Sequence, residues 1–157
     1  MLVIIVSALV GMITFGTGFF CGLKYYHVEI VKMVNLASKR LELFEIAVWW
    51  IKNPQKISEY VNQKKYKKVA IYGMSHLGDC LENTLRSSGI EVVCGIDKNA
   101  SQLYNPYIPI YNLENKLPVV DVVIITTIIC FEQIKHELQG LYGGNIDIVS
   151  LEEILYK

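Results

Sequence analysis

The 157-residue sequence has no net charge, few cysteines and no residue spacing typical of a metal site. Fifteen Lys and Arg residues balance fifteen Asp and Glu residues, so the composition carries no signal for nucleic-acid binding. The four cysteines form no Cys-x-x-Cys pair and the three histidines show no ligand spacing, so neither a disulfide framework nor a metal site is predicted. A mostly disordered chain is excluded, because 52% of the residues are hydrophobic and such chains have low hydrophobic content.

The charges that are present divide the chain into three parts. Residues 1–23 contain no Lys, Arg, Asp or Glu, residues 24–68 are predominantly basic, and residues 69–157 are predominantly acidic. Together with the patterns described below, this predicts a transmembrane anchor at residues 1–23, a helical juxtamembrane neck at 24–65 and a Rossmann-like domain at 66–157.

The uncharged segment has the length and apolarity of a transmembrane helix. At about 1.5 Å per residue it would span roughly 34 Å, enough to cross a hydrocarbon core of about 30 Å. It lacks the basic start and the small-residue cleavage site of a signal peptide. The basic residues after it favour a cytoplasmic C-terminal part. The sequence therefore predicts a single-pass protein of the cell membrane with a cytoplasmic domain.

Two further patterns in the first half of the chain predict contacts with a partner. Gly11, Gly18 and Gly22 belong to a stripe of small residues that would let a second copy or a partner membrane protein approach closely. In residues 30–51, apolar residues recur in the steps of four and three of a heptad. This heptad stripe predicts a coiled coil, a helix packed on the following domain, or a helix lying on the bilayer. The lysine-rich residues 64–68 fit either attraction to anionic lipid or a solvated connection.

The rest of the chain alternates short apolar runs with amphipathic segments. Asn53 and Pro54 are expected to end the neck helix and to start the next one, as N-cap and first helical residue. The alternation of strands and helices implies right-handed βαβ units and a parallel sheet. The predicted fold class is α/β: a transmembrane helix and helical neck, then a small Rossmann-like parallel sheet flanked by helices. We expect strands at 69–72, 90–96, 109–111, 119–127 and 146–149, and helices at 76–88, from 131 and from 151.

Ligands of such sheets bind at the carboxyl ends of the strands. Gly73 would form a tight turn there, Gly78 would let the next helix pack closely, and the helix N-terminus between them would present N–H groups to a phosphate. Asp97 has nearly the usual offset for a carboxylate that binds a ribose hydroxyl. Ser75 replaces the glycine that normally admits a pyrophosphate, and would either crowd that group or bind it. The candidate cofactor-binding residues are Gly73, Met74, Ser75, His76, Gly78, Asp97, Thr126 and Thr127, and a purely structural turn is the alternative.

The segments KKVAIYGMSHLG, EVVCGIDKNA, IPIYNLENKLPVVDVVIITT and IVSLEEIL together resemble a compact NAD(P)-binding-type Rossmann domain. They are similar to the nucleotide-binding domains of bacterial surface-polysaccharide proteins, such as sugar-modifying acyltransferases and nucleotide-sugar dehydratases. The resemblance covers about residues 66–155. It implies NAD or NADP as the ligand and a link to polysaccharide assembly, with a nucleotide-sugar as an alternative. The Gly-x-Ser sequence is also similar to CoA-binding domains. In such proteins a second domain supplies the catalysis.

No complete catalytic constellation is recognisable in the sequence, so its catalytic residues are unknown. There is no phosphate-binding P-loop, and no Tyr-x-x-x-Lys pair follows the first predicted strand. Leu77 stands where the nucleophile elbow of a hydrolase requires glycine. We therefore predict a module that binds or senses a nucleotide. The alternatives are a subunit of an oxidoreductase or sugar-modifying enzyme that a partner completes, and a scaffold that binds no ligand.

Overall fold

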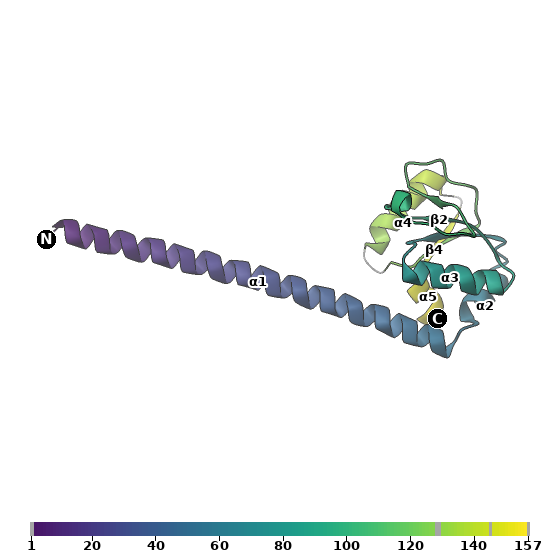
Figure 1. Ribbon diagram of the computed structural model, residues 1–157, viewed down its shortest axis with the longest axis horizontal. Helices are drawn as coiled ribbons and strands as arrows, with labels where there is room; N and C mark the ends of the chain where they lie inside the picture. Colours follow the sequence, from purple (N-terminus) through teal and green to yellow (C-terminus); the bar gives the residue numbers. More distant parts are fainter. Residues whose placement is uncertain (1, 128–129, 145, 157) are drawn as a thin grey trace. The chain divides into compact units, whose positions relative to one another are not determined.

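The computed structural model describes residues 2–127, 130–144 and 146–156, with side chains from residue 24 onward. The chain forms two compact units, Met1–Glu42 and Leu43–Lys157. Helix α1 (Leu2–Lys52) makes up the first unit and contributes its last turns to the second (Figure 1). All other elements belong to the second unit.

The prediction of a transmembrane helix is wrong for the part of the chain that the structure describes. No helix there is both long enough and apolar enough to cross a membrane. From residue 24 onward the physical reason is charge, because Lys and Arg recur with Glu along α1, so that every stretch of spanning length contains several charged side chains. The side chains of residues 1–23, including the small-residue stripe of Gly11, Gly18 and Gly22, lie outside the described residues. The fold class is corrected to α/β with one continuous N-terminal helix.

The predicted parallel sheet flanked by helices is confirmed. The described part of the second unit contains one sheet with the order β3-β2-β1-β4-β5, in which every pairing is parallel. The chain leaves β1 toward β2 and later returns to the other side of β1 as β4, so the strand order reverses between β1 and β4. The strands are β1 (Lys68–Tyr72), β2 (Glu91–Ile96), β3 (Ile110–Tyr111), β4 (Val122–Ile125) and β5 (Asp147–Ser150). The helices are α2 (Lys56–Lys64), α3 (His76–Ser87), the one-turn η1 (Ala100–Gln102), α4 (Phe131–Tyr142) and α5 (Leu151–Tyr156).

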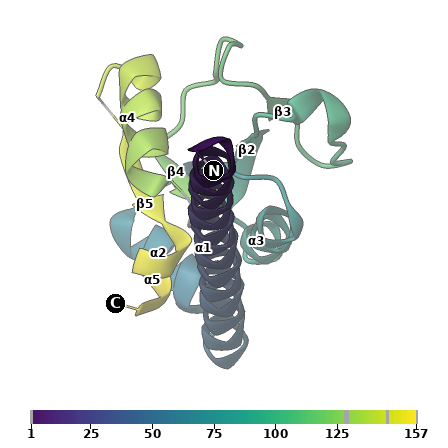
Figure 2. The same ribbon diagram turned by 90° about the vertical axis from the view of Figure 1, so that its left-hand side faces the viewer.

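The two faces of the sheet are covered by different helices. Val69 and Ile71 of β1 belong to a core shared with α2, α3, α5 and the end of α1. Ala70 and Tyr72 point the other way, into a core shared with α4. Figure 2 shows α3 and α4 on opposite sides of the strands. Because both faces are buried, the strands read as nearly continuous apolar runs, which is why the sequence predicted them.

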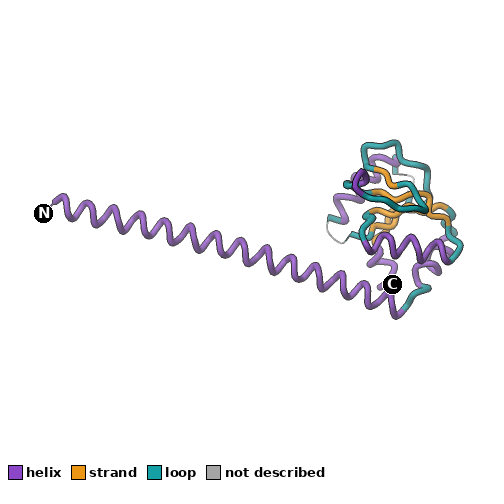
Figure 3. The backbone as a smooth tube through the Cα atoms, viewed as in Figure 1, coloured by secondary structure: helices purple, strands orange, loops and turns teal. Residues whose placement is uncertain are grey.

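The crossover from β2 to β3 contains only η1 and loop, which Figure 3 shows in teal and purple. Arg86 of α3 anchors this loop, because its guanidinium lies 3.8 Å from the centre of the Tyr107 ring. The same side chain places Nε 2.8 Å from the buried carboxylate of Glu82. A buried carboxylate needs such a partner, so Arg86 compensates a charge inside α3 while it holds the loop.

Some element boundaries differ from the predictions. Strand β4 begins only at Val122, and the preceding Asp121 carboxylate accepts the N–H groups of Lys67 and Lys68 at 2.7 and 2.8 Å. These bonds, first that of Lys68, hold the pKa of Asp121 below its usual value. Helix α1 ends at Lys52 as expected, but Asn53 and Pro54 do not start α2. They lie in a turn, and Gln55 is the N-cap instead.

Tyr142 carries a buried hydroxyl that has no hydrogen-bond partner among the described residues. Burial raises its pKa to about 12, so the group is neutral at pH 7. Tyr142→Phe is expected to raise the free energy of unfolding by about 1 kcal/mol, because it keeps the ring and removes an unsatisfied polar atom. Urea denaturation of the full chain measures this change.

Tyr66→Phe is the matched control for that substitution. The Tyr66 hydroxyl donates a hydrogen bond to the Asp147 carboxylate, so its removal should lower the free energy of unfolding by about 1 kcal/mol. Opposite signs for the two Tyr→Phe variants are the expected result. A loss of stability in Tyr142→Phe would show that its hydroxyl does find a partner.

Candidate functional site

The turn after β1 depends on a glycine and is tied to both neighbouring strands. Gly73 has φ +92°, a conformation that residues with a Cβ rarely adopt. A Cβ at this position would lie 2.7 Å from Thr126 Oγ1, beyond the end of β4. The Gly73 N–H donates to the carbonyl of Ile96 in β2 at 2.9 Å. The turn after β1 is therefore held between β2 and β4, beside the point where the strand order reverses.

Helix α3 starts directly against this turn. A Cβ on Gly78 would lie 2.3 Å from the Gly73 carbonyl oxygen, so only glycine permits this approach. Ser75 is the N-cap with an extended backbone, but its hydroxyl caps none of the helix N–H groups described. The first helical hydrogen bond runs from Asp79 N–H to Ser75 O. The preceding N–H groups have no carbonyl within the helix, which makes them donors for an anion.

Asp97 lies at the end of β2 and its carboxylate holds the glycine turn. Its Oδ2 accepts the Met74 N–H at 2.9 Å, and its Oδ1 accepts the Asn99 N–H at 2.8 Å. Each carboxylate oxygen has a second lone pair, so both can accept another hydrogen bond. The group is therefore rigidly placed and can still bind a ribose hydroxyl.

Two of the predicted residues turn their side chains away from solvent. The Met74 side chain is buried against β2, where a Cβ on Gly95 would lie 2.6 Å from Met74 Cγ. Thr126 is buried as well, and its hydroxyl lies 2.7 Å from the Gly73 carbonyl oxygen and 3.1 Å from that of Tyr72. Met74 thus offers only its backbone to a ligand, and Thr126 supports the turn.

A pocket of about 350 Å³ opens at the carboxyl edge of the sheet, between the glycine turn and the start of α4. This volume falls in the range of small-molecule sites, roughly 300–1,000 Å³. Of the predicted site residues, the pocket brings together Gly73, Ser75, Asp97 and Thr127. It is not lined by Met74, His76, Gly78 or Thr126. The complete lining is Tyr72, Gly73, Ser75, Asp97, Lys98, Thr127, Cys130, Gln133 and Ile134.

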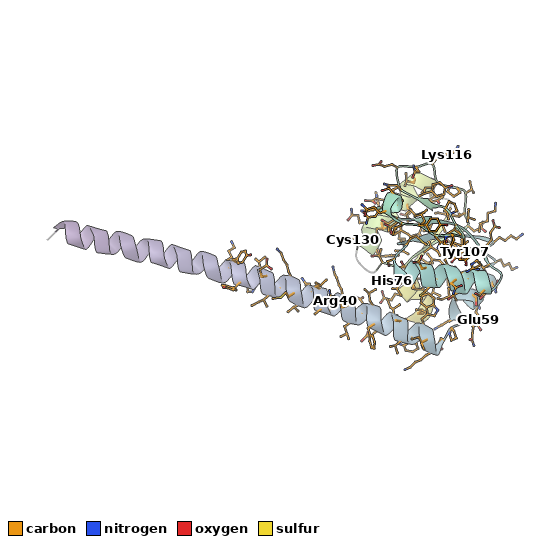
Figure 4. The ribbon with its side chains drawn as sticks, in the orientation of Figure 1. Arg40, Glu59, His76, Tyr107, Lys116 and Cys130 are labelled. Carbon is orange, nitrogen blue, oxygen red and sulfur yellow. The ribbon has the colours of Figure 1, made fainter. Side chains whose placement is uncertain are left out.

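The lining residues on the α4 side were not among the site residues predicted from the sequence. Cys130 is the N-cap of α4, and Gln133 lies in its first turn. Figure 4 labels Cys130 together with His76 at the start of α3. Since α3 and α4 each follow a parallel strand, both start at the same edge of the sheet. That rule could have identified the residues after the fourth predicted strand.

The electrostatic surroundings of the pocket are mixed. Lys98 beside Asp97 supplies a cation next to the carboxylate. Tyr72 forms a wall of the pocket, and its pKa is raised by burial first and by the nearby Glu137 and Asp97 charges next. Tyr72 is therefore a neutral hydroxyl at pH 7. The site combines one carboxylate, one ammonium group and neutral polar groups.

A smaller pocket of about 80 Å³ continues the edge toward β5. Thr127 lines both pockets, and Ile46 of α1 closes the smaller one. Among the described residues no three His, Cys, Asp or Glu side chains are grouped as they would be around a metal ion. Comparison of the chain with protein-family models, curated proteins and solved structures finds no match.

Proposed function

We propose that residues 66–157 bind a nucleotide of the NAD(P) type and act as a binding or sensing module. The observation that carries this proposal is the pocket at the point where the strand order reverses between β1 and β4. Open α/β sheets bind their ligands at this point. The pocket is also lined by Gly73 of the glycine turn, by Ser75, the N-cap of α3, and by the Asp97 carboxylate at the end of the next strand, which are groups that nucleotide sites use.

In the proposed complex the phosphates lie against the start of α3. The N–H groups of the first helical turn donate to the phosphate oxygens, and the Ser75 hydroxyl adds a further donor from the pocket wall. The ribose hydroxyls donate to Asp97, whose carboxylate is already oriented by Met74 N–H and Asn99 N–H. Because a carboxylate repels a ribose 2′-phosphate, this arrangement favours NAD over NADP.

Isothermal titration calorimetry of the full chain tests the proposal. NAD, NADP, coenzyme A and UDP-glucose are titrated separately, the last because of the resemblance to surface-polysaccharide proteins. We expect NAD to bind at least about tenfold more tightly than NADP, since a carboxylate and a phosphate would otherwise approach each other. A folded chain that binds none of the four would be a scaffold. Preference for coenzyme A or UDP-glucose would assign the pocket to that ligand class instead.

Two glycine variants connect the binding to the turn. Gly73→Ala and Gly89→Ala both place a side chain at positive φ, +92° and +76°, so both introduce backbone strain. Only the Cβ at Gly73 meets another atom, whereas the Cβ at Gly89 meets nothing within 4 Å. We expect Gly73→Ala to weaken NAD binding by about tenfold or more and Gly89→Ala to leave it nearly unchanged. Equal effects on affinity would place the ligand elsewhere.

A further inference from the structure

Along the C-terminal half of α1, the apolar side chains of one face are exposed, apart from the half-buried Val48. On this face Leu41 is 60% exposed, Phe44 is 65% exposed and Ile51 is 79% exposed. A contiguous apolar surface of this kind marks an interaction site. The heptad stripe that forms it is Ile30, Val34, Ala37, Leu41, Phe44, Val48 and Ile51.

The α/β unit packs on a different face of the same helix. Ile46 is only 1% exposed and Trp50 only 9%, and both belong to the core beneath the sheet. At 3.6 residues per turn, Ile46 lies about 140° to 160° around the helix from Phe44 and Ile51. Packing on the following domain therefore uses Ile46 and Trp50, and does not account for the heptad stripe.

The charges beside the stripe identify its occupant. With Val34, Leu41 and Val48 at the a positions, Arg40 is a g residue and Glu45 is the e residue of the next heptad. Both side chains are exposed, and Figure 4 labels Arg40 on α1. In a parallel, in-register pair of helices the g residue of one copy faces this e residue of the other. Arg40 of each copy would then meet Glu45 of its partner, twice per pair.

We propose that the heptad stripe binds the same stripe of a second copy of this chain and forms a parallel two-stranded coiled coil over residues 30–51. Its a and d residues interlock along the seam, while Ile46 and Trp50 remain available to the α/β unit of each copy. This inference is independent of the proposed nucleotide site, because it uses none of the pocket residues.

Oxidative cross-linking of the full chain tests the seam. Val34→Cys places a thiol at an a position, where the two copies would be close, and Asn35→Cys places one at the neighbouring, outward b position. Both positions are exposed in one chain, so neither substitution disturbs a core. We expect Val34→Cys to yield a reducible species of twice 17.9 kDa, and Asn35→Cys to remain at the level of the unsubstituted chain. Equal cross-linking at the two positions would overturn the proposal.

Charge reversal tests the parallel orientation in the Val34→Cys background. Arg40→Glu and Glu45→Arg should each slow cross-linking by about three- to tenfold, because two exposed ion pairs become two repulsive contacts. The combined Arg40→Glu/Glu45→Arg variant should recover the original rate. If each single variant slows the reaction and the double variant slows it further, the two residues do not face each other and the proposed register is wrong.

Discussion

Replacing Gly78 with alanine is expected to lower the free energy of unfolding by about 3 kcal/mol. The added Cβ would lie 2.3 Å from the Gly73 carbonyl oxygen and 3.1 Å from its carbonyl carbon. Both are backbone atoms of a turn that is already constrained to φ +92°. Neither can rotate aside as a side chain would, so α3 would have to move away from β1, at the upper end of the usual cost of overpacking.

Gly140→Ala is the matched control, because Gly140 also lies inside a helix. A Cβ on Gly140 of α4 meets nothing within 4 Å. Alanine should therefore stabilise the chain by about 0.5–1 kcal/mol through the lower backbone entropy of the unfolded state. Urea denaturation followed by far-ultraviolet circular dichroism measures both variants. A change of the same sign in the two variants would mean that helical propensity, rather than the contact with the turn, decides the effect at Gly78.

Replacing Thr126 with valine is expected to lower the free energy of unfolding by about 2 kcal/mol. Valine has nearly the same shape, so the cavity and strain terms are small. The substitution removes the buried hydroxyl that donates its one hydrogen to the Gly73 carbonyl oxygen at 2.7 Å, and leaves this acceptor facing a methyl group, while the Tyr72 carbonyl keeps the Thr126 N–H. Leaving a buried acceptor unsatisfied costs about 1–3 kcal/mol. The same change should weaken NAD binding, because the turn that lines the pocket loses its support.

Thr84→Val is the matched control, because it removes a hydrogen bond of similar length at an accessible position, where its loss should have little effect on stability. The Thr84 hydroxyl donates to the Cys80 carbonyl at 2.8 Å on an accessible side of α3. That carbonyl can be solvated, and the helical propensities of Thr and Val are similar, so we expect a change within about 0.5 kcal/mol. The difference between the two Thr→Val variants measures the contribution of the hydrogen bond between Thr126 and Gly73. Equal losses in Thr126→Val and Thr84→Val would show that the bond to Gly73 has no special role.

Much of the α/β domain was predictable because its signals are local. The apolar run at residues 69–72 and the glycine after it predicted β1 and its turn, and Asp97 was predicted at the end of β2 from its spacing. The last helix begins at residue 151 as predicted, and Ser150 Oγ caps it by accepting the Glu153 N–H at 2.9 Å. The strand, its turn and the cap depend on residues only a few positions apart, and Asp97 was found from the fixed offset of a known motif.

In the first half of the chain, a prediction that was based on composition is wrong. The uncharged residues 1–23 predicted a transmembrane anchor, whereas the described part of the chain contains no helix that could span a membrane. The heptad stripe left three alternatives open. The burial of Ile46 and Trp50, with Phe44 and Ile51 exposed, shows that the end of α1 does pack on the following domain, but through residues outside the heptad stripe.

By itself, the sequence determined the alternation of strands and helices, the need for glycine at positions 73 and 78, and the carboxylate at Asp97. Hydrophobic periodicity and the conformational limits of the backbone depend on neighbouring residues in the sequence, so the features that they produce can be predicted without a structure. Only the tertiary structure decided which polar groups face the pocket. Thr126 and Gly73 are 53 residues apart, and their hydrogen bond turns the Thr126 hydroxyl to the backbone, while Cys130 and Gln133 enter the pocket from α4. The alternation of strands and helices brings the start of α4 to this edge, but which of its side chains enter the pocket depends on how β4 and α4 pack beside β1.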